Sequence, residues 1–337
     1  MTGVQTCALP ISNRDRYAFG IDGVPAGDDR ITVATIGADD ETWRNVFTFP
    51  NLEELTLHGP SREQLDAIAE LSALKRLRIT HARPEEIGFL GALTNVEELV
   101  LEYVSGFSDL SPLRSLTRLK SLHVENLRRV SDFGGLAGLS SLRYLRIDGT
   151  LDWKQPIADF EFLRGLPNLE VLSFGRIVTK AAYPATLPVL GLGKLERLKL
   201  PWNMLAAEEY ALLEVGLPGV EGAAWGPWTR FAWSGGEEWF EFTGKGAGTI
   251  VAVGTTGDTS DNDDLAARAG GPSPILMYQG ERHALSGAAS IVLGPKYMTY
   301  AADWLLDRAN GKPAEEYFEM VLADGRSERR PHPRARA

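Results

Sequence analysis

The stretch that decides the fold is residues 142–147, Leu-Arg-Tyr-Leu-Arg-Ile, with aliphatic residues in the first, fourth and sixth places. The same L-x-x-L-x-L pattern, with Val, Ile or Phe allowed at its apolar places, recurs on both sides of it. Its copies start at Leu52, Leu74, Val96, Leu119, Leu142, Leu169 and Leu195, and a worn eighth copy starts at Val220. The seven clear copies start 22, 22, 23, 23, 27 and 26 residues apart. Such near-constant spacing indicates a repeat protein in which each unit stacks on the next.

The pattern also predicts how each unit folds. The second and third apolar residues of a copy are two positions apart, so both point to one face of a strand and the residues beside them point to the other. In the first unit the return segment begins with the capping-box pair Ser61 and Gln64, and Leu65, Ile68 and Leu71 follow at helical spacing. Later return segments contain proline and glycine, which favours short turns or 3-10 segments over long helices.

The recurring triplets resemble the leucine-rich-repeat family, in its short bacterial class of which the internalins are members. The resemblance covers about residues 51–225. It implies an α/β fold: a right-handed solenoid with a curved parallel sheet of seven to eight coils and a concave face that binds a partner. The family usually places Asn three residues after the third apolar position, but only Asn203 does so here. The other six places hold Pro60, Ala82, Val104, Leu127, Thr150 and Ile177. We expect apolar packing to replace that ladder of amides.

The N-terminal flank divides into two parts. Residues 1–11, MTGVQTCALPI, resemble a translated sequencing-adapter oligonucleotide, and we exclude them from fold reasoning. The natural N-terminus is then expected to be missing, and the one cysteine, Cys7, lies in the suspect stretch. Residues 12–50 are expected to form an N-terminal cap, with a strand at 31–36 and with Trp43, Val46, Phe47 and Phe49 covering the first coil.

The C-terminal flank does not fit the repeat. Residues 226–322 are expected to form a tryptophan-rich cap and a small α/β or irregular extension, which is either native to this gene or a foreign fragment. Five tryptophans support the cap, namely Trp202, Trp225, Trp228, Trp233 and Trp239. Strands are expected at 250–253, 275–278 and 317–322 and an amphipathic helix at 300–309. Residues 323–337 are rich in arginine and are expected to form a disordered basic tail.

Motifs that could carry chemistry are weak in this chain. Residues 232–236, Ala-Trp-Ser-Gly-Gly, resemble a nucleophile elbow, but the residues after the serine alternate like a strand where an elbow needs a helix. The glycine-rich 244–248 lacks the Walker spacing, and the acidic loop 258–264 lacks the EF-hand spacing. Glu281, His283 and Ser286 have no clear third partner. We therefore predict no catalytic residue, no metal and no cofactor.

Charge and hydropathy exclude some classes of partner. The chain has 337 residues and a formal net charge of −10, which argues against a general nucleic-acid binder. No apolar run is long enough to span a bilayer. The sequence favours a cytoplasmic location and leaves a secreted or surface location open, because the true N-terminus is expected to be missing.

The outward side chains of successive strands should form columns, because parallel strands stack ~4.8 Å apart. The middle column, from Thr56 to Lys199, is largely basic, and the third column is acidic in its central three repeats. The residues predicted to bind a partner are Arg76, Arg78, Glu98, Glu102, His123, Glu125, Tyr144, Arg146, Asp148 and Lys199. The charges either pair between neighbouring coils or form stripes that select a complementary protein or peptide.

The function predicted from these features is a protein-interaction module without catalysis. Two alternatives stay open at this point. Residues 240–322 could be a hydrolase-like enzyme fragment that the repeats serve as a recruiting module, or the repeats could be purely architectural.

Overall fold

The structure, a computed structural model, describes residues 19–225 and nine strands further along the chain. These strands are β11 Trp228–Ala232, β12 Glu238–Phe242, β13 Thr249–Ala252, β14 Met277–Tyr278, β15 Glu281–Arg282, β16 Ala284–Leu285, β17 Ala289–Ser290, β18 Tyr317–Val321 and β19 Ser327–Pro331. The described residues belong to two compact units. The first comprises residues 19–181 and 192–199, and the second comprises residues 182–191 and those from 200 on.

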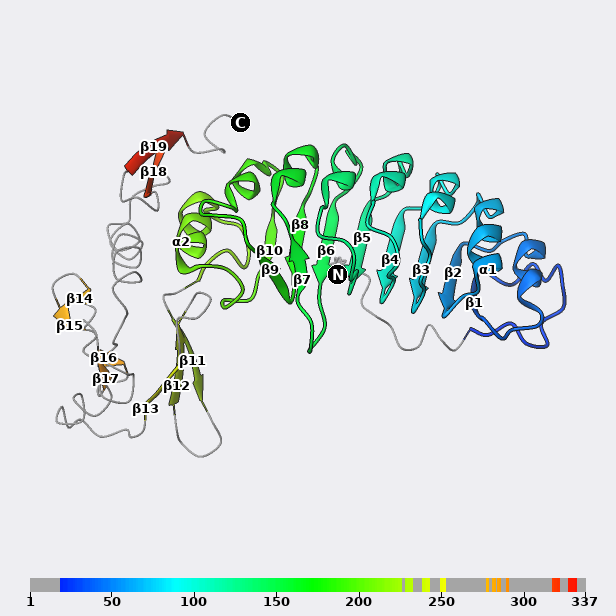
Figure 1. The fold of residues 1–337 in the computed structure, drawn as a ribbon, viewed down its shortest axis with the longest axis horizontal. Helices are drawn as coiled ribbons and strands as arrows, with labels where there is room; N and C mark the ends of the chain where they lie inside the picture. The colour runs from blue at the N-terminus through cyan, green and yellow to red at the C-terminus, as the bar shows by residue number, and fades with distance from the viewer. Residues whose placement is uncertain are drawn as a thin grey trace, which may run out of the picture. The chain divides into compact units, whose positions relative to one another are not determined.

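The first unit is built on an eight-stranded, all-parallel sheet in the order β1-β2-β3-β4-β5-β6-β8-β10 (Figure 1). Its strands are β1 Val33–Gly37, β2 Glu54–His58, β3 Arg76–Thr80, β4 Glu98–Glu102, β5 Ser121–Glu125, β6 Tyr144–Asp148, β8 Val171–Phe174 and β10 Arg197–Lys199. Within this unit the strands line the inner side of an arc and the return turns line its outer side. The predicted stack of coils with one parallel strand each is confirmed.

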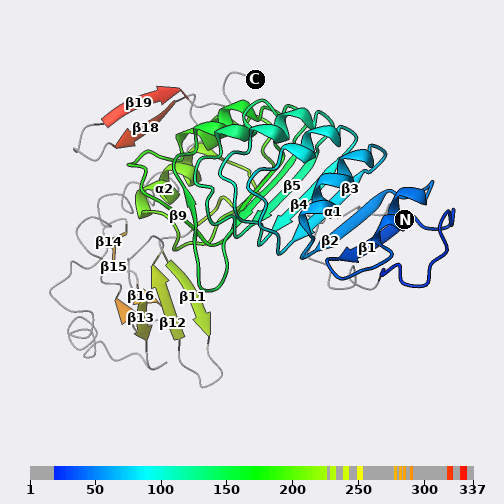
Figure 2. The same cartoon turned by 45° about the vertical axis from the view of Figure 1, so that its right-hand side comes forward.

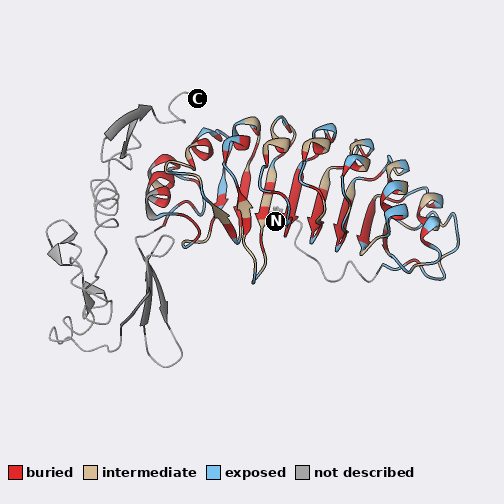
Figure 3. Cartoon of the chain, viewed as in Figure 1, coloured by how far each residue is buried: buried red, intermediate tan, exposed pale blue. Residues whose placement is uncertain are grey.

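An aliphatic spine holds the coils together. The second apolar residues of the seven triplets face one another in register, from Leu55 on β2 to Leu198 on β10. Every member of this row is at most 2% exposed, so the predicted alignment of Leu55, Leu77, Leu99, Leu122 and Leu145 is confirmed. Figure 3 shows buried residues along these strands. The burial of such a row by neighbours on both sides supplies the core that one coil alone lacks.

The return segments are short, as their proline and glycine content predicts. They are the 3-10 turns η3 Ile68–Glu70, η4 Gly88–Ala92, η5 Ser111–Ser115, η6 Gly134–Leu136 and η7 Glu161–Gly165. The first return also contains the helix α1 Arg62–Ala67, with Ser61 and Gln64 forming the predicted capping box. Figure 2 shows these turns on the side of the sheet away from its open face.

The first coil begins earlier than the repeat pattern indicates. Strand β1 is the first strand of the sheet and pairs in parallel with β2, and the 3-10 turn η2 Trp43–Thr48 returns the chain. Residues 31–50 are therefore a further coil as well as a cover. At the other end the expected eighth copy is wrong. Val220, Ala223 and Trp225 are buried, but no strand of the sheet follows β10 among the described residues.

Two longer coils explain the spacings of 27 and 26. After β6 and after β8 the chain adds the short strands β7 Gln155–Ile157 and β9 Ile177–Thr179, which pair in parallel with each other. Gln155 is fully buried. Its Oε1 accepts from the backbone N–H of Leu127 at 2.9 Å, and its Nε2 donates to the carbonyl of Val130 at 2.7 Å. One buried amide thus ties two coils together, as the family's Asn would.

A second set of amides ties neighbouring coils where the chain enters a triplet. Asn51, Asn95 and Asn168 each precede the first apolar residue of a triplet, and each Nδ2 donates to a backbone carbonyl of the preceding coil at 2.7 to 2.8 Å. At the places where the family has Asn, Val104 and Leu127 are at most 1% exposed. Apolar packing does replace the missing ladder there, as predicted, and amides are used elsewhere.

The second unit contains the turn η8 Leu187–Gly191 and the helix α2 Ala207–Gly216. The buried carboxylate of Glu209 accepts from the backbone N–H groups of Ala185 and Thr186 at 2.7 and 3.0 Å. Trp225 is buried, lies 5.2 Å from the ring of Tyr210 and donates from Nε1 to the carbonyl of Leu200. These contacts order the segment that follows the repeats.

The structure tests part of the C-terminal predictions. The strands expected at 250–253, 275–278 and 317–322 correspond to β13, β14 and β18. Within the tail predicted at 323–337, residues 327–331 form β19, which pairs antiparallel with β18. The expected helix at 300–309, the elbow serine, the glycine-rich and acidic loops and residues 1–11 lie outside the described residues. Among the described helices none is long and apolar enough to cross a membrane.

Candidate binding face of the sheet

The candidate site is the face of the sheet opposite to the 3-10 turns. Alternation along each strand places the residues between the aliphatic positions on this face. The register aligns Arg78, Val100, His123 and Arg146 in one row. A second row lies two residues further along each strand and holds Thr80, Glu102, Glu125 and Asp148. The columns expected from the sequence are therefore the columns of the fold.

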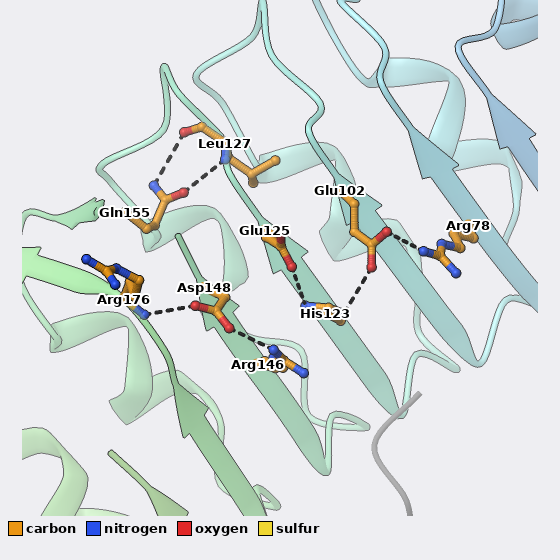
Figure 4. Close-up of polar contacts among 9 residues, drawn as sticks. All are labelled: Arg78, Glu102, His123, Glu125, Leu127, Arg146, Asp148, Gln155 and Arg176. Atoms are coloured by element: carbon orange, nitrogen blue, oxygen red, sulfur yellow. Dashed lines mark hydrogen bonds and ion pairs between the residues drawn. The ribbon is translucent and has the colours of Figure 1, made fainter. Parts of the chain in front are cut away.

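The charges of the two rows pair with each other. The Nη2 of Arg78 lies 2.5 Å from Oε2 of Glu102, and both side chains are less than a tenth exposed. The Nη2 of Arg146 lies 2.7 Å from Oδ2 of Asp148, whose other oxygen accepts from the backbone N–H of Arg176 (Figure 4). The basic and acidic columns are thus joined by ion pairs in the middle of the sheet. The charges of the two stripes therefore partly balance each other.

His123 lies between two carboxylates (Figure 4). Its Nδ1 is 3.8 Å from Oε1 of Glu102, and its Nε2 is 3.8 Å from Oε2 of Glu125. Both distances exceed that of a hydrogen bond. His123 is 1% exposed, and neither ring nitrogen has a hydrogen-bond partner within the described part of the chain. Such an unsatisfied buried ring calls for a physical explanation.

Burial perturbs the acid–base behaviour of this cluster. Burial, with Arg146 and Arg78 nearby, lowers the pKa of His123 to about 3. Burial, with Glu102 and Asp148 nearby, raises the pKa of Glu125 to about 7. At neutral pH the imidazole is therefore uncharged and the carboxyl of Glu125 is close to half protonated. The loss of charge on both groups lowers the cost of keeping them out of water.

The remaining predicted residues lie around this cluster. Arg76 starts β3, and its Nε donates to Oε2 of Glu54 at 2.7 Å, which is the simple pairing between neighbouring coils. Glu98 follows Arg76 in register and is half-buried, as is Tyr144 on β6. Lys199 is exposed on β10, outside the central cluster. The structure thus brings six of the ten predicted residues together in one cluster on β3 to β6, within which Arg78–Glu102 and Arg146–Asp148 are two separate ion pairs.

Sequence reasoning missed an aromatic row at the edge of the sheet. His81 and Tyr103 directly follow β3 and β4 in the left-handed backbone region, and Asn126 does so after β5. Their backbone N–H groups donate to the carbonyls of Glu102, Glu125 and Asp148 on the next coil. The rings of His81 and Tyr103 stack with centroids 4.9 Å apart, and Tyr103 is 40% exposed. Each of these residues stands two positions after the third apolar residue of its triplet, so the sequence could have predicted this row.

Seven triplets in one register, one parallel strand per coil and a 3-10 return on the opposite side decide the fold. The chain contains a leucine-rich-repeat solenoid. No family model and no curated protein sequence matches it. Three solved structures are similar to part of the chain. Internalin C2 from Listeria monocytogenes is 29% identical, with 48% of this chain and 66% of that chain covered and a TM-score of 0.36.

The internalin inlF, also from Listeria monocytogenes, is 20% identical, with 53% of this chain and 61% of that chain covered and a TM-score of 0.34. A leucine-rich-repeat protein from Leptospira interrogans is 14% identical, with 54% and 58% covered and a TM-score of 0.29. This chain spans less than two thirds of the length of each of these structures. The assignment of the solenoid rests on its own strands, register and coil length.

Proposed function

We propose that the open face of the sheet binds another protein or a peptide, without catalysis. Eight in-register strands give a face about 35 Å long, enough for a helix or an extended segment. This face carries Tyr144 and Arg146 on β6, and tyrosine and arginine are among the residue types that contribute most to binding in protein interfaces. The observation that carries the proposal is the presence of two ion pairs in its centre, Arg78–Glu102 and Arg146–Asp148.

The stability of the fold alone does not explain these ion pairs. Arg78 and Glu102 are both almost fully buried, and the desolvation of two charges offsets most of their attraction. The solenoid core lies on the other face of the sheet and does not require them. What the network does provide is rigidity, because each charged side chain is held in one geometry before a partner arrives. A face that is already ordered loses less entropy on binding.

The chemistry of the face indicates the kind of segment that fits. Tyr103 and His81 offer an exposed aromatic stack at one edge, Tyr144 lies beside the central network, and Lys199 adds a cation on β10. A segment with an apolar or aromatic anchor and an acidic residue would complement these groups. Arg78 and His123, which were predicted as contact residues, are too buried to contribute much area and act as supports of the face.

Peptide display against the full chain tests the proposal without a partner in hand. Peptides selected on the wild-type chain should bind a Tyr144→Ala/Arg146→Ala variant at least tenfold more weakly, because both side chains would contact the peptide. An Arg114→Ala/Arg164→Ala variant is the matched control, since these arginines lie in the last turns of η5 and η7 on the opposite side. Equal affinity for the first variant and loss in the second would move the site to the turns.

The hydrolase-like alternative for residues 240–322 falls mostly outside the described residues and stays a prediction. The purely architectural alternative is tested by the same display experiment. A chain that selects no peptide family at all would favour it over a binding face.

A further inference from the structure

The unexplained feature of the face is the triad Glu102, His123 and Glu125. Each residue offers one ligand atom, and the three atoms lie within 4.8 Å of one another. His123 is buried with both ring nitrogens lacking a hydrogen-bond partner within the described residues, and Oε1 of Glu102 is buried in the same condition. These groups are aimed at one another across β4 and β5 at distances too long for hydrogen bonds.

We propose that this triad is a divalent metal site, and that zinc is the ion that it suits. One ring nitrogen of His123 and one oxygen from each of Glu102 and Glu125 would be the three protein ligands, with water in the fourth position. This goes beyond the proposed binding function and does not depend on it. The expectation from the sequence was that the chain has no metal site.

The donor set favours zinc over the hard cations. Zinc is bound by imidazole nitrogen and carboxylate oxygen at ~2.0–2.2 Å, whereas calcium and magnesium take oxygen ligands. A tetrahedral ion with such bonds sets its ligand atoms ~3.4 Å apart. The three candidate ligand atoms lie within 4.8 Å of one another, so each must move closer to reach this spacing. The two 3.8 Å separations involve different ring nitrogens, Nδ1 toward Glu102 and Nε2 toward Glu125, so side-chain rotations must bring both carboxylates to one nitrogen of His123.

The surroundings suit a cation. The second oxygen of Glu102 is held by Arg78, which would orient that ligand as outer-shell partners of metal sites do. The cluster counts three carboxylates, from Glu102, Glu125 and Asp148, against the guanidiniums of Arg78 and Arg146, so it is net negative when all are ionised. The side chain of Glu125 is 21% exposed, which gives an ion a route from solvent.

Calorimetric titration of the full chain with zinc chloride at neutral pH tests the site. The wild-type chain is expected to bind one zinc ion at the triad, and His123→Gln and Glu125→Gln should each weaken that binding at least tenfold. His58→Gln is the matched control, because His58 lies on the same sheet at the end of β2, outside the triad. Calcium and magnesium chloride at the same concentrations should not compete.

Circular dichroism establishes that each variant is folded before its titration is interpreted. Should His123→Gln fail to fold, Glu125→Gln decides, since Glu125 is only half-buried. The proposal is overturned if the wild-type chain does not bind zinc, or if folded His123→Gln or Glu125→Gln binds it as the wild type does. A loss of zinc binding with intact peptide binding in the display assay separates this site from the proposed function.

Discussion

Leu145→Asp is expected to lose about 5 kcal/mol or more of the free energy of unfolding of the solenoid. Leu145 lies within the aliphatic spine, is fully buried and faces Leu122 and Leu172 in register. Removal of a buried leucine side chain costs about 2–5 kcal/mol through lost burial and the cavity left behind. A carboxylate without a partner in that cavity adds a desolvation cost.

Urea denaturation followed by circular dichroism measures this effect, with Leu151→Asp as the control. Leu151 receives the same chemical change six positions later but is 82% exposed, so its variant should stay within about 0.5 kcal/mol of the wild type. Equal midpoints for Leu145→Asp and the wild type would show that Leu145 does not lie in a core.

Gly106→Ala is expected to destabilise the chain by about 3 kcal/mol, although it adds one methyl group. The φ of Gly106 is +119°, a region that residues with a side chain rarely adopt. A Cβ at this position would lie 2.2 Å from the backbone carbonyl oxygen of Pro84 on the preceding coil. Backbone strain of about 1–3 kcal/mol and displacement of that coil would therefore add to each other.

Gly138→Ala separates the two contributions. Gly138 also has a positive φ, +98°, but nothing lies within 4 Å of the place where its Cβ would be. Its variant should lose only the strain, about 1–2 kcal/mol. If urea midpoints show equal losses for both variants, contact between the coils at Pro84 is looser than the structure has it.

The solenoid was predictable because its signal is local and repeated. Seven triplets at near-constant spacing require the same fold seven times, and the two-residue offset within each triplet fixes which side chains face inward. Strand β1, which the sequence predicts only as a strand of the N-terminal cap, does not match the triplet because Ala34 stands at the second apolar place, between Ile31 and Ile36. Residues 220–225 match the triplet pattern because Val220, Ala223 and Trp225 are buried in the second unit.

The polar network was only half predictable. The columns followed from the period, so residues such as Arg78, Glu102 and His123 could be chosen from the sequence. The pairing of these charges could not be predicted from the sequence. Arg78 pairs with a carboxylate on the next strand, whereas Arg146 pairs with one on its own strand. Burial on an outward face also has no sequence signal, since it depends on the length and rotamers of the neighbouring side chains.

The candidate metal triad shows the same limit. Its ligands, Glu102, His123 and Glu125, come from two coils, and the only short spacing is the two residues between His123 and Glu125. No sequence motif with metal-ligand spacing contains all three. Stacking of β4 on β5 creates the proximity, and this depends on the register between two strands.

Photo-crosslinking from the two faces of the solenoid tests the central claim most directly. A benzophenone amino acid replaces Tyr144 on the sheet in one variant and Arg164 in the turn η7 in another. With a peptide selected on the wild-type chain, illumination should give a covalent adduct from position 144 and none from position 164. An adduct from position 164 with none from position 144 would contradict binding on the open face of the sheet.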